Sequence, residues 1–352
     1  MEMSTAATAP GPSPRERALL TAARAGDENA YQQLVEPHRR ELRAHCYRML
    51  GSIHDADDAV QDALLRAWRG LPRFEGRSST RSWLYKITTN ACLNTIARQP
   101  KGRVLPVDFG AAADPHGGAG VPLVESVWMQ PYPDERLDLG DDRAAPDARY
   151  DRRESVELAF VAALQHLPAN QRAVLIMREV LGFSAKESAD ALDTTVASIN
   201  SALQRARKTI DDKLPDQSQQ ATLRTLGDER VRELVQRYVD AWESGDVSRV
   251  VAMLTEDATF SMPPNVAWFH GRDAIEAFLP TGPMAMPRRF VPVQANGQVA
   301  FGTYLLEDGR FRANAIHLID FRGEQVSEIV AFLDRAVFDE FGLPFYLPEA
   351  GG

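Results

Sequence analysis

The feature that most constrains the fold of this chain is an acidic interruption, rich in proline and glycine, that begins after its first hundred residues. Residues 104–170 carry twelve acidic and five basic side chains, and the stretch DFGAAADPHGGAGVPLVESVWMQPYPDERLDLGDDRAAPDARYD has no sustained apolar period. Proline and glycine at this density break long helices and strands. We therefore predict a linker over residues 101–152, with separately folded segments on either side of it.

Length and composition exclude several classes of protein. The 352 residues are too many for one ordinary core, so we expect three domains. Apolar residues make up 44% and charged residues 25% of the chain, as in soluble globular proteins, and no apolar run is long enough to span a bilayer. We expect no membrane association. Residues 1–14 are small, polar and proline-rich, which predicts a disordered leader and not a signal peptide.

Cysteine usage indicates a reducing, cytoplasmic location. Cys46 and Cys92 lie inside apolar helical patterns and lack the spacing of metal ligands. We expect no disulfide, no metal site and no cofactor.

Residues 15–100 are predicted to be helical throughout. One apolar pattern ends at Gly51, and a helix begins at Asp55 and closes at Gly70. Its buried stripe comprises Ala56, Ala59, Val60, Ala63, Leu64 and Ala67. The opposite face carries Asp58, Gln61, Asp62, Leu65 and Arg69. Leu65 is either a scattered surface leucine or, near Trp68, an anchor for the helices of a partner protein.

A basic segment follows in a chain whose formal net charge is −9. Residues 77–103 carry six Lys or Arg side chains and no acidic one. Helical spacing leaves a polar strip of Trp83, Lys86, Thr89, Asn90 and Asn94, with Arg77, Arg81, Arg98, Lys101 and Arg103 around its ends. Basic groups neutralise phosphates, aromatic rings stack on bases, and amides and hydroxyls contact base edges, so the strip suits unpaired DNA or RNA. A central helix with Trp83 in the core and solvated charges explains this segment equally well.

Residues 153–214 predict a helix-turn-helix. Ser184 and Glu187 form a capping box, Asp193 and Thr194 make the turn, and Thr195 caps a longer helix. In that helix the predicted core stripe is Val196, Ile199, Leu203, Ala206 and Ile210. The outward residues suit entry into a major groove: Ala197, Ser198, Asn200, Ser201, Gln204, Arg205, Arg207 and Lys208. An ordinary helical hairpin is the less favoured alternative.

The C-terminal third mixes helices and strands. After a short linker at residues 215–227, residues 228–340 predict a long helix, a short helix, a strand, a helix after Gly271, and hairpins turning at Asn296-Gly297, Asp308-Gly309 and Arg322-Gly323. Asp257 is expected to cap a helix-to-strand turn. The tail, residues 341–352, follows Phe338. We expect Phe338, Phe341, Phe345 and Tyr346 to be exposed and to pack on another domain or a second chain.

The order of these motifs resembles a known family. DADDAVQDALLRAWRGL, RSSTRSWLYKITTNA, HLPANQRAVLIMREVLGFSAKESADAL and SALQRARKTI are similar to the extracytoplasmic-function (ECF) sigma factors of bacterial RNA polymerase over about residues 16–214. The resemblance implies two all-α sigma domains: region 2, a helical bundle, and region 4, the helix-turn-helix. It implies core RNA polymerase, through its clamp helices and flap, and promoter DNA as partners.

The resemblance also implies roles for individual residues. Polymerase-binding residues would be Asp58, Gln61, Asp62, Leu65, Arg66 and Trp68. Residues that melt and read the −10 element would be Arg77, Ser79, Arg81, Trp83, Lys86, Thr89, Asn90, Asn94 and Arg98. Residues that read the −35 element would be Thr195, Ala197, Ser198, Asn200, Ser201, Gln204, Arg205 and Lys208. The acidic linker, which in family complexes threads the RNA channel, is either a polyanion mimic or a flexible tether. Its island WMQPYPDERL is a candidate for docking.

Residues 228–339 resemble the SnoaL-like, polyketide-cyclase-type fold, an α+β cone-shaped barrel around a pocket. The fusion resembles the SigG-like branch of ECF sigma factors, in which the added domain regulates polymerase binding. Pocket candidates are Tyr238, Trp242, Phe260, Trp268, His270 and His317. We expect a binding or regulatory domain with no catalytic residues, and an unidentified small molecule as a candidate ligand. The alternative is a DNA-binding regulator with a ligand-binding or enzymatic domain that does not join polymerase.

Overall fold

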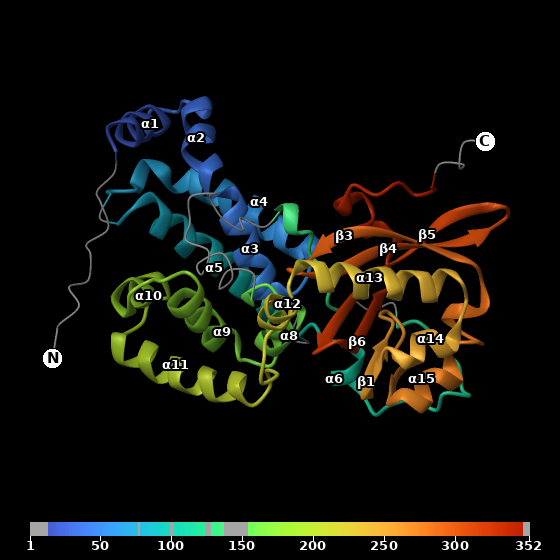
Figure 1. The fold of residues 1–352 in the computed structure, drawn as a ribbon. Coiled ribbons are helices and arrows are strands. Elements are labelled where there is room, and N and C mark those ends of the chain that lie inside the picture. The colour runs from blue at the N-terminus through green and yellow to red at the C-terminus, as the bar shows by residue number, and fades with distance from the viewer. Residues whose placement is uncertain (1–12, 77, 99–101, 124–127, 137–153, 348–352) are drawn as a thin grey trace.

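The computed structural model describes residues 13–76, 78–98, 102–123, 128–136 and 154–347. Its first helices form one bundle, the first helical domain (Figure 1). They are α1 Pro14–Arg24, α2 Glu28–Val35, α3 Arg39–Leu50, α4 Ile53–Gly70 and α5 Thr80–Arg98, with short 3-10 turns at Glu36–His38 and Leu71–Arg73.

Local sequence explains where these helices begin and end. Gly51 ends α3 in the left-handed conformation, with φ 68°, as predicted. Helix α4 begins before the expected Asp55, because the Ser52 hydroxyl accepts a hydrogen bond from the Asp55 amide at 3.3 Å and caps the helix. The predicted α4 stripe is buried in full: Ala56, Ala59, Val60, Ala63, Leu64 and Ala67.

The second helical domain contains the predicted helix-turn-helix. Its helices are α8 Leu158–Gln165, α9 Ala169–Leu175, a π-helical turn Ile176–Val180, α10 Ala185–Ala191 and α11 Val196–Asp211. The capping box is confirmed, since the Ser184 hydroxyl accepts from the Glu187 amide at 3.1 Å and the Ser184 amide donates to the Glu187 carboxylate at 2.8 Å. Thr195 caps α11 as expected. Val196 was wrongly placed in the core stripe, because it is the first residue of α11 and lies exposed.

Much of the predicted linker is folded against its neighbours. It contains α6 Pro106–Phe109 and a 3-10 turn at Asp134–Arg136. The docking island is buried at Trp128, Met129 and Tyr132, and the Tyr132 ring lies 4.5 Å from that of Tyr47 in α3. The flexible-tether interpretation is therefore wrong for residues 102–123 and 128–136, whereas residues 124–127 and 137–152 lie outside the described chain. The second predicted linker also holds a helix, α12 Gln219–Leu226.

The C-terminal domain is a six-stranded sheet covered by helices on one face (Figure 1). Its strands run in the order β2-β1-β6-β5-β4-β3, with β1 parallel to β6 and all other pairs antiparallel. The elements are α13 Asp228–Glu243, α14 Val247–Ala252, β1 Leu254–Ser261, β2 Trp268–His270, α15 Arg272–Phe278, a 3-10 turn Pro283–Ala285, β3 Arg288–Ala295, β4 Gln298–Glu307, β5 Arg310–Arg322 and β6 Gln325–Phe332.

Most local predictions for this domain are confirmed. The three predicted turns join β3 to β4, β4 to β5 and β5 to β6, and a helix follows Gly271. The expected capping role of Asp257 is wrong, because Asp257 lies within β1 and both its carboxylate oxygens accept hydrogen bonds from Arg322 at 2.9 Å.

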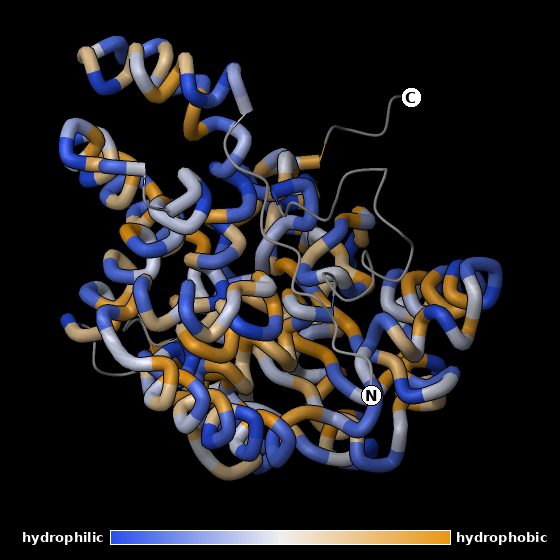
Figure 2. Tube along the Cα trace, turned by 90° about the vertical axis from the view of Figure 1, so that its left-hand side faces the viewer, coloured by the Kyte–Doolittle hydropathy of each residue, from blue (hydrophilic) through white to orange (hydrophobic). Residues whose placement is uncertain are grey.

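The two faces of the sheet pack against different partners. One face and helices α13 to α15 enclose an aromatic core that includes Tyr238, Trp242 and Phe260. The other face contributes Ile316 and Val330, among others, to the apolar core that both helical domains build. Figure 2 shows apolar segments concentrated in the middle of the molecule. The C-terminal domain therefore packs directly on the helical domains.

The tail folds back on this outer face of the sheet. Phe338 is buried against Tyr304, with ring centroids 5.5 Å apart, so its predicted exposure is wrong. Leu343 occupies the space that a side chain at Gly302 would fill. The predicted exposure is confirmed for Phe345 and Tyr346, whereas Phe341 is half-buried. The tail packs within its own chain because β4 and β5 leave an apolar surface for it.

Candidate functional site

Part of the polar strip predicted on α5 faces the helix-turn-helix. The Lys86 ammonium lies 2.6 Å from the Asp193 carboxylate and donates to the Asp190 carbonyl at 2.8 Å. The Arg81 guanidinium lies 5.0 Å from the centre of the Phe183 ring and pairs with Glu41 at 3.1 Å. Two of the predicted DNA-contacting cations are thus already engaged by protein groups.

The other members of this strip are placed differently from one another. Trp83 is half-buried and stacks on Phe74, with ring centroids 4.5 Å apart. Thr89 is fully buried and hydrogen bonds to His45 at 2.9 Å, so it does not belong to an accessible strip. Asn90 is half-buried, whereas Ser79, Asn94 and Arg98 are exposed. Arg77 and Lys101 lie outside the described residues.

The predicted major-groove face of α11 is exposed. The buried side of the helix consists of Ile199, Leu203, Ala206 and Ile210, as predicted. The opposite face leaves Thr195, Ala197, Ser198, Asn200, Ser201, Gln204, Arg205 and Lys208 accessible. Arg207 is held in an ion pair with Glu179 at 2.5 Å. This geometry suits insertion of a helix into a major groove.

The predicted polymerase face of α4 is also accessible. Leu65 is 57% exposed, more than any other large apolar residue of α4. Asp58, Gln61 and Arg66 are exposed around it, and Arg66 pairs with Asp62 at 2.6 Å. Trp68 is less available, because it is half-buried with its ring 5.0 Å from that of Tyr31. The α4 face thus presents one apolar side chain among charged neighbours.

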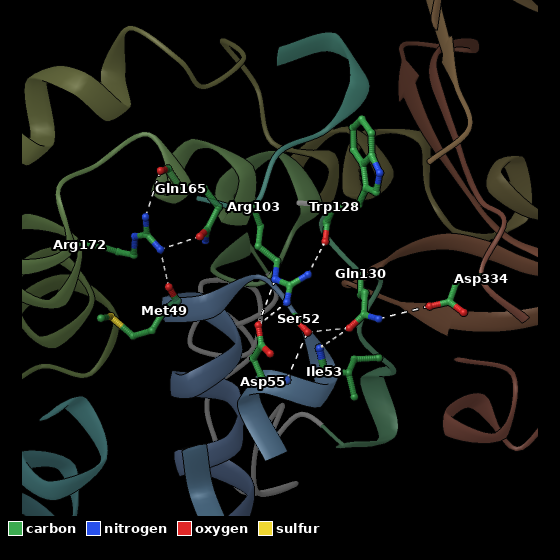
Figure 3. A network of polar contacts seen from close by, with 10 residues as sticks. All are labelled: Met49, Ser52, Ile53, Asp55, Arg103, Trp128, Gln130, Gln165, Arg172 and Asp334. Carbon is green, nitrogen blue, oxygen red and sulfur yellow. Dashed lines mark hydrogen bonds and ion pairs between the residues drawn. The ribbon is translucent and has the colours of Figure 1, made fainter. Parts of the chain in front are cut away.

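Buried arginines hold the two helical domains together. Arg172 of α9 donates to the Met49 carbonyl of α3 and to the Gln165 side chain (Figure 3). Arg48 of α3 donates to both the carbonyl and the hydroxyl of Ser155 at 2.9 Å. Burial lowers the pKa of Arg172 to about 10, so the guanidinium remains charged at neutral pH. Hydrogen bonds from buried charged donors are stronger than neutral ones, so they fix how the domains dock.

The linker joins this junction through a second polar network. Arg103 pairs with Asp55 and donates to the Trp128 carbonyl at 3.0 Å (Figure 3). The Gln130 side-chain carbonyl accepts from the Ser52 hydroxyl at 2.8 Å, and its amide donates to Asp334 at 3.3 Å. Gln130 therefore connects α4 with the C-terminal domain.

Asn296, in the turn between β3 and β4, contacts both helical domains and the linker. Its side-chain amide donates to the Tyr47 hydroxyl of α3 and to the Val156 carbonyl of the second helical domain, both at 2.8 Å. Its side-chain oxygen accepts from the Tyr132 amide of the linker at 2.8 Å. Asn296 is fully buried with φ 54°, a backbone conformation that asparagine tolerates. The sequence indicated only a hairpin turn here.

The pocket candidates divide into two groups. Phe260 and His317 line a cavity of about 180 Å³ inside the C-terminal domain, and Tyr238 and Trp242 pack behind His317. His270 is exposed, and the Trp268 indole donates to the Gly110 carbonyl at 2.8 Å on the outside of the domain, so neither belongs to the cavity. Both lie on the short edge strand β2.

His317 is neutral in this environment. Burial, followed by the charge of nearby Arg288, lowers the pKa of His317 to about 3. Its Nε2 lies 3.0 Å from the Tyr238 hydroxyl, whose own pKa is raised by burial. Sequence reasoning missed Arg288, although the inward position of Phe290 two residues later on β3 indicates that Arg288 faces the same side.

Comparison with known proteins agrees with these features. Three family profiles match: Sigma-70 region 2 over residues 34–101, Sigma-70 region 4 over residues 157–210, and the SnoaL-like domain over residues 235–329. The chain is 42% identical over 325 residues to the ECF RNA polymerase sigma factor SigG of Mycobacterium tuberculosis, which covers 91% of this chain and 85% of that relative. It is 31% identical over 191 residues to SigM of the same organism, which covers 54% of this chain and 79% of SigM.

A solved structure shares the overall fold. The crystal structure of the M. tuberculosis ECF sigma factor SigJ matches with a TM-score of 0.52 and 21% identity, covering 87% of this chain and 97% of SigJ. Two sigma-70 regions followed by a SnoaL-like domain define the class of protein. The chain belongs to the ECF family of RNA polymerase sigma factors, which bind core polymerase and direct transcription initiation at promoters.

No described helix is both long and apolar enough to cross a membrane. In the same part of the chain, no three or more histidine, cysteine or acidic side chains are grouped so that they could hold a metal ion.

Proposed function

We propose that this sigma factor adopts a closed state that must open before it reads a promoter. The working units are residues 15–100, which bind the polymerase clamp and the −10 element, residues 153–214, which read the −35 element, and residues 228–340, which hold the other two together. The protein acts in the cytoplasm, where the polymerase is. The observation that carries the proposal is the contact of Lys86 with the turn of the helix-turn-helix at Asp193.

The spacing of promoter elements makes this contact incompatible with reading both elements. The −10 and −35 elements lie about 25 base pairs apart, which corresponds to roughly 85 Å at about 3.4 Å per base pair. In this structure α5 and α10 are in direct contact through Lys86. The two DNA-reading domains must therefore separate by tens of ångströms before both elements are bound.

The C-terminal domain supports the closed state from several sides. Asn296 bonds to both helical domains and to the linker. Gln298 accepts a hydrogen bond from the Leu158 amide at 2.8 Å. Helix α12 connects the same two domains, because Glu157 accepts from the amides of Gln219 and Gln220 and the Gln219 side chain donates to the Phe321 carbonyl at 2.7 Å. Because these contacts are buried, we infer that this domain regulates the sigma factor by restraining its opening.

The proposal also assigns roles to individual residues of the two helical domains. We propose that Leu65, with Asp58, Gln61, Asp62 and Arg66 around it, contacts the polymerase clamp. The −10 contacts are proposed for the predicted set without buried Thr89: Arg77, Ser79, Arg81, Trp83, Lys86, Asn90, Asn94 and Arg98. The −35 contacts are proposed for the exposed face of α11.

We further propose that the C-terminal domain binds and does not catalyse. A general base works best when its pKa lies near the working pH, but burial lowers the pKa of His317 to about 3. Among the described residues that line the cavity, no carboxylate is available as an alternative base. In this proposal the SnoaL-like domain serves regulation, and promoter recognition itself requires no chemical reaction.

Opening can be measured by energy transfer between dyes on the two helical domains. Cysteines replace exposed Arg40 and Lys213, while native Cys46 and Cys92 stay unlabelled because they are buried. We expect transfer to fall when core polymerase and promoter DNA are added. A pair within the first helical domain, on Arg40 and Arg73, is the control and should not change. Unchanged transfer in the first pair at saturating polymerase and promoter would refute the closed-state proposal.

A further inference from the structure

The cavity of the C-terminal domain combines an apolar wall with one cation. Its volume is about 180 Å³. Most of its lining is apolar or aromatic, including Phe260, Met262, Phe278, Leu305 and Leu333. The charged side chain in that lining is Arg288, and a slightly smaller apolar cavity, of about 150 Å³, holds benzene, so a molecule with one aromatic ring fits.

Arg288 lacks the partner that a buried cation normally has. It is only 4% exposed, and its guanidinium lies 5.0 Å from the centre of the Trp242 ring. Its Nε is buried without a hydrogen-bond partner in the described part of the chain, and no carboxylate of that part lines the cavity. Burying an unpaired charge is costly, because protein groups replace its hydration shell only partly. A site of this kind is stabilised by an anion.

We propose that the cavity binds a small monocarboxylic acid with an apolar or aromatic body, and that Arg288 pairs with the carboxylate. The inference rests on the proposed binding role of the C-terminal domain and specifies its ligand. The planar guanidinium presents paired donors that match the two oxygens of a carboxylate. An aromatic or branched body fits the rings that surround the guanidinium.

The linker between the DNA-reading domains closes one side of this cavity. Ala119 contributes to the lining. The segment around it is held by backbone hydrogen bonds from Ala113 to the Trp268 carbonyl at 2.8 Å and from Leu123 to the Pro264 carbonyl at 2.9 Å. A ligand in the cavity therefore touches the segment that connects the two helical domains. This contact gives the ligand a direct route to the closed state.

Benzoate and benzamide form a matched pair of probes, because they share a ring and differ in charge. Isothermal titration of the full chain should show saturable benzoate binding with a Kd below about 1 mM and benzamide binding at least about tenfold weaker. Arg288→Met should weaken benzoate binding at least about tenfold, since it removes the buried cation. The control is Arg289→Met at the next position, where the exposed side chain pairs with Glu243 at 3.3 Å; its affinity should stay within about twofold.

Hydrogen exchange then tests the link to the linker. Benzoate should slow exchange of the Ala113 and Leu123 amides in the native chain and in Arg289→Met, but not in Arg288→Met. Equal binding of benzoate and benzamide, or equal loss of binding in both arginine variants, overturns the carboxylate assignment. Absence of binding by either probe up to about 10 mM, roughly the weakest affinity worth measuring, overturns it as well.

These results are separable from the closed-state proposal. The dye-pair measurement needs no ligand, so it stands or falls independently of the cavity. If Arg288→Met does not fold, the ratio of benzoate to benzamide affinity in the native chain alone decides the assignment.

Discussion

Asn296→Gly is the substitution that most directly tests whether the C-terminal domain holds the sigma factor closed. The backbone of Asn296 has φ 54°, which glycine adopts without strain, and its amide still reaches the Tyr132 carbonyl at 2.9 Å. Only the side-chain hydrogen bonds are lost. Tyr47 keeps a partner, because its hydroxyl donates to the Gln130 carbonyl at 2.8 Å. The Val156 carbonyl and the Tyr132 amide lose theirs.

The magnitude follows from these two orphaned groups. Each buried, unsatisfied polar group costs about 1–3 kcal/mol, so the closed state loses about 2–6 kcal/mol. A loss of about 3 kcal/mol shifts the ratio of open to closed molecules by roughly 150-fold. If only the open state binds core polymerase, the apparent Kd is inversely proportional to the open fraction, so it falls as that fraction rises towards one. Asn296→Gly should therefore bind core polymerase more tightly than the native chain.

The matched control is Asp308→Gly. Asp308 has φ 49° and precedes a glycine in the next hairpin turn, but it is exposed. Asp308→Gly therefore reports the effect of placing glycine at a left-handed turn position that lies outside the domain junction. Affinity is measured by fluorescence anisotropy of the labelled chain titrated with core polymerase, after near-ultraviolet circular dichroism has shown that both variants are folded. Equal affinities for the two folded variants would refute the reasoning.

Three further predictions follow from the same contacts. Leu65→Asp should weaken core binding by about tenfold or more while the fold is kept. Met286→Asp, at an exposed apolar position of the C-terminal domain, should leave the polymerase titration unchanged. Asp193→Asn removes the ion pair with Lys86 but not the hydrogen bond from Lys86 to the Asp190 carbonyl. Because such an exposed pair contributes at most about 1 kcal/mol, the ratio of open to closed molecules, measured by energy transfer, should rise by no more than about fivefold. A larger rise would contradict this energy. Burial raises the pKa of Glu157 to about 7. A carboxylic acid with a raised pKa in the folded state makes the folded protein less stable as the pH rises from the unfolded pKa near 4.5 to about 7. The denaturation midpoint of the native chain, relative to that of Glu157→Gln, should therefore fall across that pH range, and parallel pH profiles would show that the pKa is not raised.

Elements with strong local signals were predictable from the sequence. The capping box at Ser184, the cap at Thr195 and the hairpin turns depend on neighbouring residues, so their chemistry is visible in short stretches. The apolar stripe of α4 follows from helical spacing in the same way. Val196 shows the limit of this approach, since spacing alone does not tell that the first residue of a helix lies beyond the packed surface.

Contacts between segments far apart in the chain were not predictable. Nothing near Asn296 indicates that its amide lies between Tyr47 and Val156, because those partners come from other domains. Thr89 looked accessible for the same reason, as its partner His45 lies on a different helix. Arg288 was hidden by its neighbour Arg289, since two adjacent arginines on a strand suggest a solvated pair although they point to opposite sides.

The position of Asn296 late in the chain has a consequence for protein synthesis. The 85 residues from Asp211 at the end of α11 to Asn296 take about 4–17 s to translate at about 5–20 residues per second. For those seconds the promoter-reading helices of a nascent chain are complete, but the hairpin that fastens them has not been made. Under the closed-state proposal, each new molecule therefore passes through a brief period on the ribosome before the contacts of Asn296 can form.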